Sequence, residues 1–254
     1  MAGRAPVQVR GLAIAALALV ALAPARAGDG PAPPPFADEI AAFQARDALQ
    51  PPAPGGIVFT GSSSIRLWPD LAGDFPGLGA LNRGFGGSTI ADATGHAEVL
   101  VVRHRPRQVV LYAGDNDLAN GLAPDQVAAD FAAFVRRLRA ADPRLAIAFI
   151  AIKPSQARIG LLPAQRRANA LVQAMVAADP DLAYVDVATP MLDADGRPRA
   201  ALYQADGLHL TDAGYRLWRE RIAPRLRPAG AGQQEPGTRP GSGIAADSGR
   251  GDRI

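Results

Sequence analysis

The sequence predicts an α/β domain in which helices cover both faces of a parallel sheet. Short apolar runs alternate with amphipathic stretches along most of the chain, which is the pattern of repeated strand–helix units. Small polar or glycine-rich motifs follow these runs, and functional sites in such folds gather at the carboxyl ends of the strands. We therefore expect one sheet, with the functional residues beyond the ends of its strands.

Five short apolar runs are the expected strands. They cover residues 57–60, 78–82, 109–112, 145–152 and 182–187. Two longer stretches, 125–140 and 163–178, carry apolar residues at helical spacing and are the expected helices between them. Thr211 is placed to cap a final helix that contains Leu217, Trp218 and Ile222.

The two ends of the chain differ from this pattern. Residues 1–27 combine a basic start, an apolar run at 12–23 that is too short to span a bilayer, and an Ala-Arg-Ala cleavage sequence at 25–27. They predict a secretory signal and export to a periplasm or out of the cell, with no stable membrane insertion after cleavage. An uncleaved anchor or a core helix is the alternative. Residues 28–35 are expected to form a Pro-rich leader, 36–227 the folded domain and 228–254 a disordered tail.

Charge and cysteine content exclude two further classes of protein. The chain has 27 basic and 24 acidic residues, but three of the arginines lie in the expected signal, so the remainder is balanced. A nucleic-acid-binding domain usually keeps a basic excess, and no nucleic-acid partner is therefore expected. The chain has no cysteine, so it has neither a disulfide framework nor a lipid-anchored cysteine.

A histidine with a nearby aspartate is the first candidate for catalysis. Of the three histidines, only His209 follows a carboxylate, Asp206, by three residues in a glycine-containing loop. An aspartate that binds one imidazole nitrogen leaves the other nitrogen free to take a proton from a hydroxyl. A polar loop that caps the last helix is the alternative interpretation. His96, in an expected helix, and His104, in a basic stretch that we expect to be exposed, are interpreted as structural.

Three other motifs follow expected strands. Residues 61–64 read Gly-Ser-Ser-Ser and offer either a nucleophilic hydroxyl or a helix cap. Residues 82–88, Asn-Arg-Gly-Phe-Gly-Gly-Ser, can turn backbone N–H groups toward a small anion or form only a tight turn, and their spacing is not that of a phosphate loop. Residues 114–117, Gly-Asp-Asn-Asp, offer an amide that can donate to an oxyanion. An Asx turn or a site for a hard cation is the alternative.

Taken in order, the four motifs resemble the four sequence blocks of the SGNH, or GDSL-type, hydrolase family. The resemblance extends from about residue 57 to about residue 218. It implies a flavodoxin-like, three-layer α/β/α sandwich around a parallel sheet of about five strands. It also implies a serine esterase that uses no metal or organic cofactor.

The resemblance implies roles for particular residues. It makes Ser63 the nucleophile and Asp206 and His209 the other members of the triad. The backbone N–H groups of Ser63 and Gly87 and the side chain of Asn116 would then form the oxyanion hole.

One position departs from the family's pattern. The first block usually reads Gly-Asp-Ser, whereas Ser62 stands here in place of the aspartate. That aspartate is not a member of the triad, so the chemistry is unaffected. The departure nevertheless leaves Ser62 and Ser64 as rivals of Ser63 for the role of nucleophile.

The expected activity is hydrolysis of carboxylic esters through an acyl-enzyme. The expected partner is a small-molecule, glycan or lipid ester, and the sequence predicts no oligomeric state. Expected export and the lack of a long apolar lid favour short acyl groups, with acetyl groups on carbohydrate first. A lysophospholipase or thioesterase, and a non-catalytic module that binds a small anion, are the alternatives.

Overall fold

A computed structural model describes residue 3 and residues 35–229 of the chain. Contacts divide the chain into Met1–Pro35 and Phe36–Ile254, and the description below concerns the second unit. The expected signal and leader, apart from residues 3 and 35, and the tail beyond residue 229 lie outside the described residues. Among the residues that are described, no helix is both long and apolar enough to cross a membrane.

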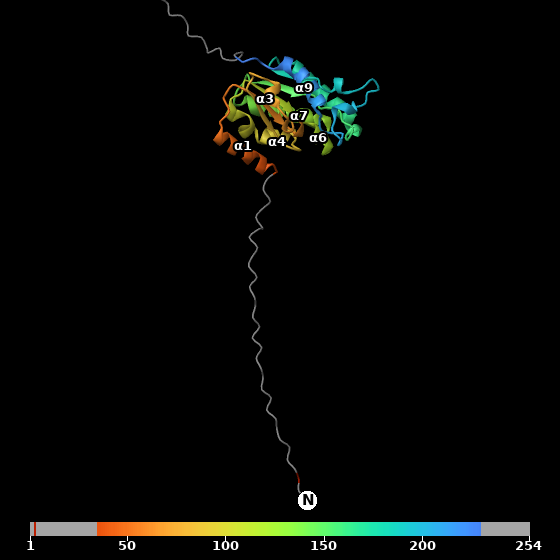
Figure 1. Ribbon diagram of the computed structural model, residues 1–254, viewed down its shortest axis with the longest axis horizontal. Helices are drawn as coiled ribbons and strands as arrows, with labels where there is room; N and C mark the ends of the chain where they lie inside the picture. Colours follow the sequence, from red (N-terminus) through yellow and green to blue (C-terminus); the bar gives the residue numbers. More distant parts are fainter. Residues whose placement is uncertain (1–2, 4–34, 230–254) are drawn as a thin grey trace, which may run out of the picture. The chain divides into compact units, whose positions relative to one another are not determined.

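Five parallel strands form the central sheet, in the order β2-β1-β3-β4-β5 (Figure 1). They are β1 (Ile57–Gly61), β2 (Ala80–Gly84), β3 (Gln108–Tyr112), β4 (Ala146–Ile150) and β5 (Leu182–Val185). All neighbouring pairs run parallel. Each predicted apolar run is therefore a strand, and the strand order is that of flavodoxin-like folds.

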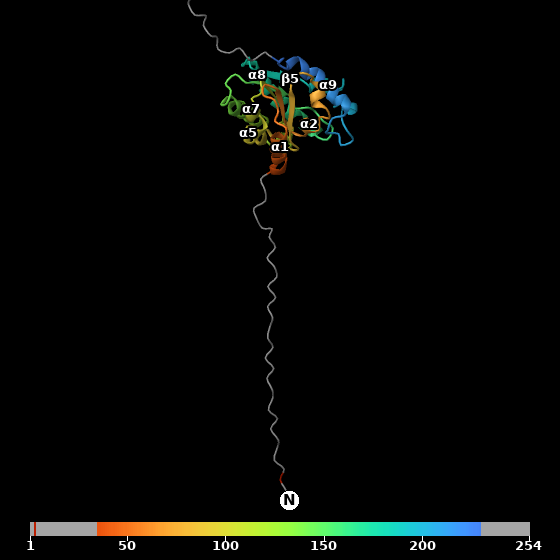
Figure 2. The same cartoon turned by 60° about the vertical axis from the view of Figure 1, so that its left-hand side comes forward.

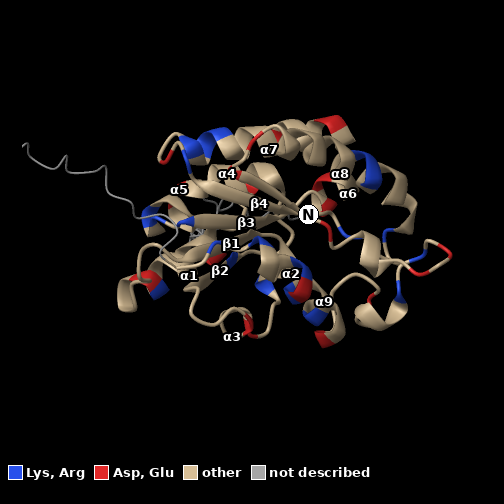
Figure 3. Ribbon diagram, turned by 90° about the horizontal axis from the view of Figure 1, so that it is seen from above, with Lys and Arg blue, Asp and Glu red and all other residues tan. Residues whose placement is uncertain are grey.

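Helices cover both faces of this sheet and complete the three-layer sandwich (Figures 2 and 3). One face carries α1 (Ala37–Leu49), α4 (Ile90–Gly95), α5 (Ala97–Leu100), α7 (Pro124–Arg139) and α8 (Leu162–Ala177), and the other carries α2 (Ser63–Arg66), α3 (Leu71–Asp74) and α9 (Asp212–Ile222). Successive side chains of a strand point to opposite faces, so Val58 belongs to the first apolar cluster and Ile57 and Phe59 to the second.

Short helices lie in the connections between these elements. They are α6 (Asp115–Ala119), which follows β3, and the 3₁₀ turns η1 (Val102–His104), η2 (Ile159–Leu161), η3 (Thr189–Met191), η4 (Ala200–Leu202) and η5 (Ala223–Arg225). The predicted helices correspond to α7, α8 and α9, with bounds that differ by one residue for α7 and α8. The hydroxyl of Thr211 accepts a hydrogen bond from the Gly214 N–H, as expected for the cap of α9.

The sequence did not predict α1. Only Ile40 and Phe43 of its thirteen residues are buried, so its apolar stripe is too narrow to be recognised by periodicity.

His104 corrects a second expectation, since its side chain is buried rather than exposed. It is 5% exposed, and its Nε2 lies 3.2 Å from the Val99 carbonyl oxygen and 3.6 Å from the Asp47 carboxylate. Burial and the nearby charge of Arg83 lower the pKa of His104, which favours the neutral ring. His96 lies between α4 and α5, with its ring edge-to-face against Phe85.

The register of the sheet sets where the functional motifs meet. Gly61, the last residue of β1, is paired with Gly84 of β2 on one side and with Tyr112 of β3 on the other. The three strands therefore end level with one another. Because the chain leaves all three at the same end of the sheet, the residues that follow them are neighbours in space.

Candidate active site

Ser63 follows β1 at a turn that only glycine permits. Gly61 has a φ of 116°, and a Cβ atom there would lie 2.0 Å from the Tyr112 carbonyl oxygen. The Ser62 N–H donates to that same oxygen at 2.8 Å, which ties the turn to β3. The chain then enters α2 at Ser63. The turn thus places Ser63 at the first helical position beyond the strand.

The three adjacent serines differ in exposure and in contacts. Ser62 and Ser64 are each 2% exposed, whereas Ser63 is half-buried. The Ser63 Oγ lies 3.1 Å from the His209 Nε2. Of the three hydroxyls, that of Ser63 is the one hydrogen-bonded to the histidine.

Asp206 holds the opposite side of the His209 ring. The His209 Nδ1 lies 2.6 Å from the Asp206 Oδ2. The other carboxylate oxygen, Oδ1, accepts from the N–H groups of Leu208 and His209 at 2.8 and 2.9 Å. The Leu208 bond, followed by the bonds from His209, lowers the pKa of Asp206 to about 2. An ionised Asp206 fixes the tautomer with hydrogen on Nδ1, which leaves Nε2 to accept a proton from Ser63.

The two other sequence-predicted donors lie next to each other. Gly87 is in the turn after β2, with a φ of 79°. Asn116 lies in α6, after β3, and its Nδ2 donates to the carbonyl oxygen of Ser88 at 3.0 Å. This bond joins the third motif to the residue that directly follows Gly87. The structure thus brings together residues from all four motifs.

Two polar side chains, one buried and one half-buried, connect the elements that carry these residues. Asp117 accepts from the Gly114 N–H at 2.9 Å and from the Ile90 N–H at 3.0 Å, so it joins α6 to the start of α4. Burial raises the pKa of Asp117. Asn82 donates to the Ile65 carbonyl oxygen at 2.7 Å, which joins β2 to α2. Sequence reasoning noted both residues within their motifs but gave them no role.

A charged group that contacts the Asn116 side chain was missed by sequence reasoning. Asp115, which is 3% exposed, lies 2.8 Å from the Arg158 Nη1 and 3.5 Å from the Lys153 Nζ. Its other oxygen accepts from the Gln165 side chain at 3.1 Å. Burial lowers the pKa of Lys153. The one available signal was that Lys153, the only lysine of the chain, directly follows a buried apolar run.

The arrangement of acidic side chains bears on the hard-cation alternative for the motif after β3. Within residues 35–229, no group of three or more histidine, aspartate or glutamate side chains is arranged to hold a metal ion. Asp115 and Asp117 have separate partners, as described above. The possible hard-cation site at 114–117 is therefore not supported by the structure.

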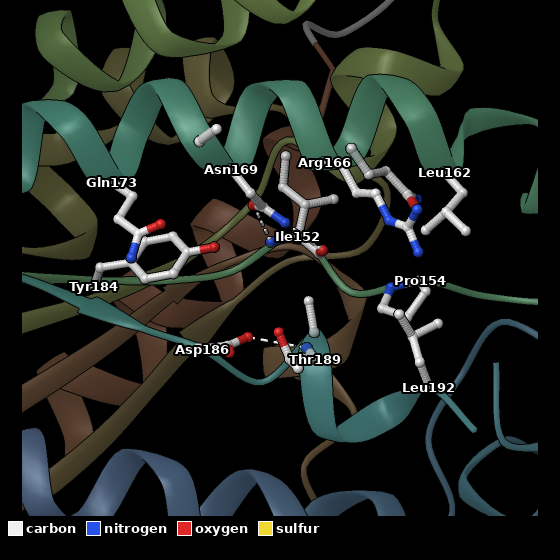
Figure 4. A pocket seen from close by; sticks show the side chains of 13 residues that line it. Ile152, Pro154, Leu162, Arg166, Asn169, Gln173, Tyr184, Asp186, Thr189 and Leu192 are labelled. Atoms are coloured by element: carbon white, nitrogen blue, oxygen red, sulfur yellow. Dashed lines mark hydrogen bonds between the residues drawn. The ribbon is translucent and has the colours of Figure 1, made fainter. Parts of the chain in front are cut away.

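A separate cavity of about 220 Å³ lies between α8 and the chain after β5 (Figure 4). In Figure 4, Asn169 of α8 bonds to the Ile152 backbone, and Asp186 accepts from the Thr189 N–H. The residues lining the cavity include none of Ser63, Gly87, Asn116, Asp206 and His209. This cavity is therefore distinct from the place where Ser63 and His209 meet.

The fold belongs to the doubly wound α/β class, and it brings Ser63, His209 and Asp206 into contact. Residues 55–217 match the model of the GDSL-like lipase/acylhydrolase family. The match covers more than half of the chain, so the protein belongs to this family. The search of curated proteins found no match to this chain.

Solved structures share the fold at low sequence identity. A GDSL-like lipase from Bacteroides thetaiotaomicron has 20% identity and a TM-score of 0.63, covering 73% of this chain and 96% of its own. A lipase/acylhydrolase from Enterococcus faecalis has 22% identity and a TM-score of 0.54, covering 70% and 100%. A catalytic mutant of an acetylxylan esterase from Geobacillus stearothermophilus has 15% identity and a TM-score of 0.53, covering 68% and 94%.

Proposed function

We propose that this protein is an exported serine esterase that hydrolyses carboxylic esters through an acyl-enzyme. The observation that carries the proposal is the continuous hydrogen-bonded chain from the Ser63 Oγ through the His209 ring to the Asp206 carboxylate. A hydroxyl, a base and a carboxylate in this order constitute a nucleophile, its proton acceptor and the group that orients the acceptor.

The reaction proceeds in two halves. The Ser63 Oγ attacks the ester carbonyl carbon while its proton moves to the His209 Nε2, and the carbonyl oxygen becomes an oxyanion. The oxyanion collapses, the C–O bond to the alcohol breaks, and His209 returns the proton to the leaving alcohol. A water then attacks the Ser63 ester by the same route and releases the carboxylic acid and free Ser63.

The proposed oxyanion hole consists of the N–H groups of Ser63 and Gly87 and the amide of Asn116. One Asn116 hydrogen is bonded to the Ser88 carbonyl oxygen, and the other remains for the developing charge. Removal of one such donor costs about 10²–10³ in kcat. We therefore expect Asn116→Ala to lose about that factor in kcat on p-nitrophenyl acetate while it retains the circular dichroism spectrum of the wild type.

Labelling with a fluorophosphonate probe tests the nucleophile directly. We expect the probe to label the wild type at Ser63 and to leave Ser63→Ala unlabelled and inactive. Ser62→Ala and Ser64→Ala are the matched controls, because each removes one hydroxyl from the same turn, and both should remain labelled. Full activity of Ser63→Ala, or labelling that maps to Ser62 or Ser64, would contradict the assignment. Absence of labelling in the wild type would favour a non-catalytic, anion-binding module.

We further propose that the substrate carries a short acyl group, with acetyl on carbohydrate as the first choice. The support is indirect: one protein of similar fold is an acetylxylan esterase, and another is an acetyl esterase crystallised with acetate. Turnover of acetyl and octanoyl p-nitrophenyl esters distinguishes this from an acylhydrolase for long chains. A kcat/KM that is higher for octanoyl than for acetyl would contradict the proposal and favour a lysophospholipase or thioesterase.

Export remains a proposal based on residues 1–27, which, apart from residue 3, lie outside the described residues. We expect the protein recovered from the periplasm or medium of an expressing bacterium to begin at Gly28. N-terminal sequencing of that material is the measurement. Recovery of only full-length protein from the cytosol would contradict it.

A further inference from the structure

Arg158 contacts the proposed oxyanion donor from outside the four motifs. Its Nη2 donates to the Asn116 Oδ1 at 3.0 Å. The two residues are 42 positions apart in the chain, and Arg158 lies in the connection between β4 and η2. The guanidinium therefore approaches Asn116 from a segment to which neither the motifs nor the mechanism assigned a function.

The contacts of Asn116 determine which end of its amide faces the substrate. The oxygen is bound by a cation, and one hydrogen of the Nδ2 is bound by the Ser88 carbonyl oxygen at 3.0 Å. A reversed amide would place its NH₂ group against the guanidinium and its oxygen against a carbonyl oxygen, and both contacts would be repulsive. The remaining N–H is thus held in one orientation. A positive charge at the amide oxygen also makes that N–H a stronger donor.

The guanidinium is itself held in place by a carboxylate at its other nitrogen. Its Nη1 lies 2.8 Å from the Asp115 Oδ2, and Asp115 is fixed by Lys153 and by the Gln165 side chain. The planar fork of an arginine allows one nitrogen to bind the carboxylate while the other binds the amide. The Asp115 carboxylate thus lies between two basic side chains, those of Arg158 and Lys153, and keeps the guanidinium against Asn116.

The same segment also contacts the loop that carries the base. The Ala157 N–H donates to the Gly207 carbonyl oxygen at 3.1 Å. Consecutive residues thus contact the loop containing Asp206 and His209 on one side and the oxyanion donor on the other. This arrangement links the two halves of the site through residues 157 and 158.

We propose that Arg158 is a positioning residue for the oxyanion hole, which orients and polarises the Asn116 amide while Asp115 holds the guanidinium in place. The proposal rests on the proposed function, because it requires Asn116 to donate to an oxyanion. It predicts that loss of Arg158 lowers kcat and leaves KM for a neutral ester nearly unchanged, since the contact matters only when charge develops.

A double-mutant cycle tests whether Arg158 acts through Asn116. The four proteins are the wild type, Arg158→Met, Asn116→Ala and the double variant, all assayed for kcat and KM on p-nitrophenyl acetate. We expect Arg158→Met to lose roughly 10- to 100-fold in kcat, less than the 10²–10³ lost with the donor itself. The double variant should match Asn116→Ala to within about threefold, because an orienting residue has no effect once the group it orients is absent.

Three further variants separate positioning from stability. Arg158→Lys retains a charge that can pair with Asp115 but lacks the fork, so it should show a similar loss in kcat with an unchanged thermal midpoint. Arg166→Met removes an exposed arginine that lines the separate cavity and should behave as the wild type. Millimolar guanidinium should restore part of the kcat of Arg158→Ala and none of that of Asn116→Ala.

The outcomes distinguish this inference from the proposed function. A wild-type kcat in Asn116→Ala would overturn the oxyanion assignment itself. A slowed Asn116→Ala with a wild-type kcat in Arg158→Met would overturn only the role of Arg158. Losses that multiply in the double variant would show that Arg158 acts independently of Asn116, and they would overturn the proposal as well.

Discussion

Replacing Asp206 with asparagine should damage the proposed base more than the small chemical change suggests. The Asp206 Oδ1 accepts from the N–H groups of Leu208 and His209 at 2.8 and 2.9 Å. An asparagine at this position would keep its oxygen on those two donors, so its NH₂ group would face the His209 Nδ1. In the wild type, this nitrogen lies 2.6 Å from the carboxylate. The ring would then carry its hydrogen on Nε2.

A histidine with its hydrogen on Nε2 cannot accept the proton of Ser63. A forced wrong tautomer in such a triad costs up to about 10⁴ in kcat. The Asp206 side chain is 45% exposed, and water can therefore compete for the ring nitrogen, which lowers the expected cost. We expect Asp206→Asn to lose between about 10³ and about 10⁴ in kcat, or roughly 4–5.5 kcal/mol of transition-state stabilisation.

Steady-state hydrolysis of p-nitrophenyl acetate measures this loss. Asp195→Asn is the control, because it makes the same chemical change at another exposed aspartate. Asp206→Ala provides the comparison without a misdirected NH₂ group, and we expect Asp206→Asn to be at least as slow. A kcat for Asp206→Asn within tenfold of the wild type would refute the reasoning about the tautomer.

Three other predictions concern charge and stability. The contacts of Asp206 lower its pKa to about 2, so the stabilisation that they give the fold is complete above the unfolded value of about 3.9 and is lost as the pH falls toward 2. NMR titration measures this pKa, and a value above 4 would be inconsistent with the contacts. Asp117→Asn should lose about 2 kcal/mol of unfolding free energy in urea, because it leaves a buried N–H without an acceptor, and the exposed Asp125→Asn should change little. Asp47→Ala should lose about 3 kcal/mol, because Arg83 is only 1% exposed and would keep its charge unpaired. The double change of Asp47→Leu with Arg83→Met should recover most of that loss.

The sequence predicted the sheet because the relevant signal is local. A buried strand needs a few consecutive apolar residues, and the runs at 57–60 and 109–112 became β1 and β3, whose residues are all buried. Helix α7 was predicted for the same reason, since its buried residues recur at helical spacing. The same criterion failed for α1, which buries two residues and packs mainly through them.

The proposed triad and oxyanion residues were selected from the order of four motifs and not from any single motif. Each motif alone also suited a turn or a cap, and the structure shows that some of those alternatives hold at the same time. Thr211 caps α9 two residues after His209, and Asp117 binds the backbone of its own turn. A structural role and a place in the site are thus compatible in these loops.

The resemblance favoured Ser63 among the three adjacent serines but left Ser62 and Ser64 as rivals. In the structure, the turn at Gly61 places the Ser63 hydroxyl 3.1 Å from the Nε2 of His209, 146 residues away. His104 was misjudged for a related reason. Its arginine-rich neighbours suggested exposure, whereas Asp47, which is distant in the chain, lies beside its ring.

By itself, the sequence determined the strands, the long helices and the family. These depend on apolar spacing and on short motifs, each of which lies within a continuous stretch of residues. Only the tertiary structure showed that Lys153, Asp115 and Arg158 form one charged group and that this group contacts Asn116. These contacts depend on how loops after β3 and β4 close over neighbouring strand ends. Side-chain contacts between distant loops leave no periodic pattern in the sequence, so they become visible only when the sheet has brought those loops together.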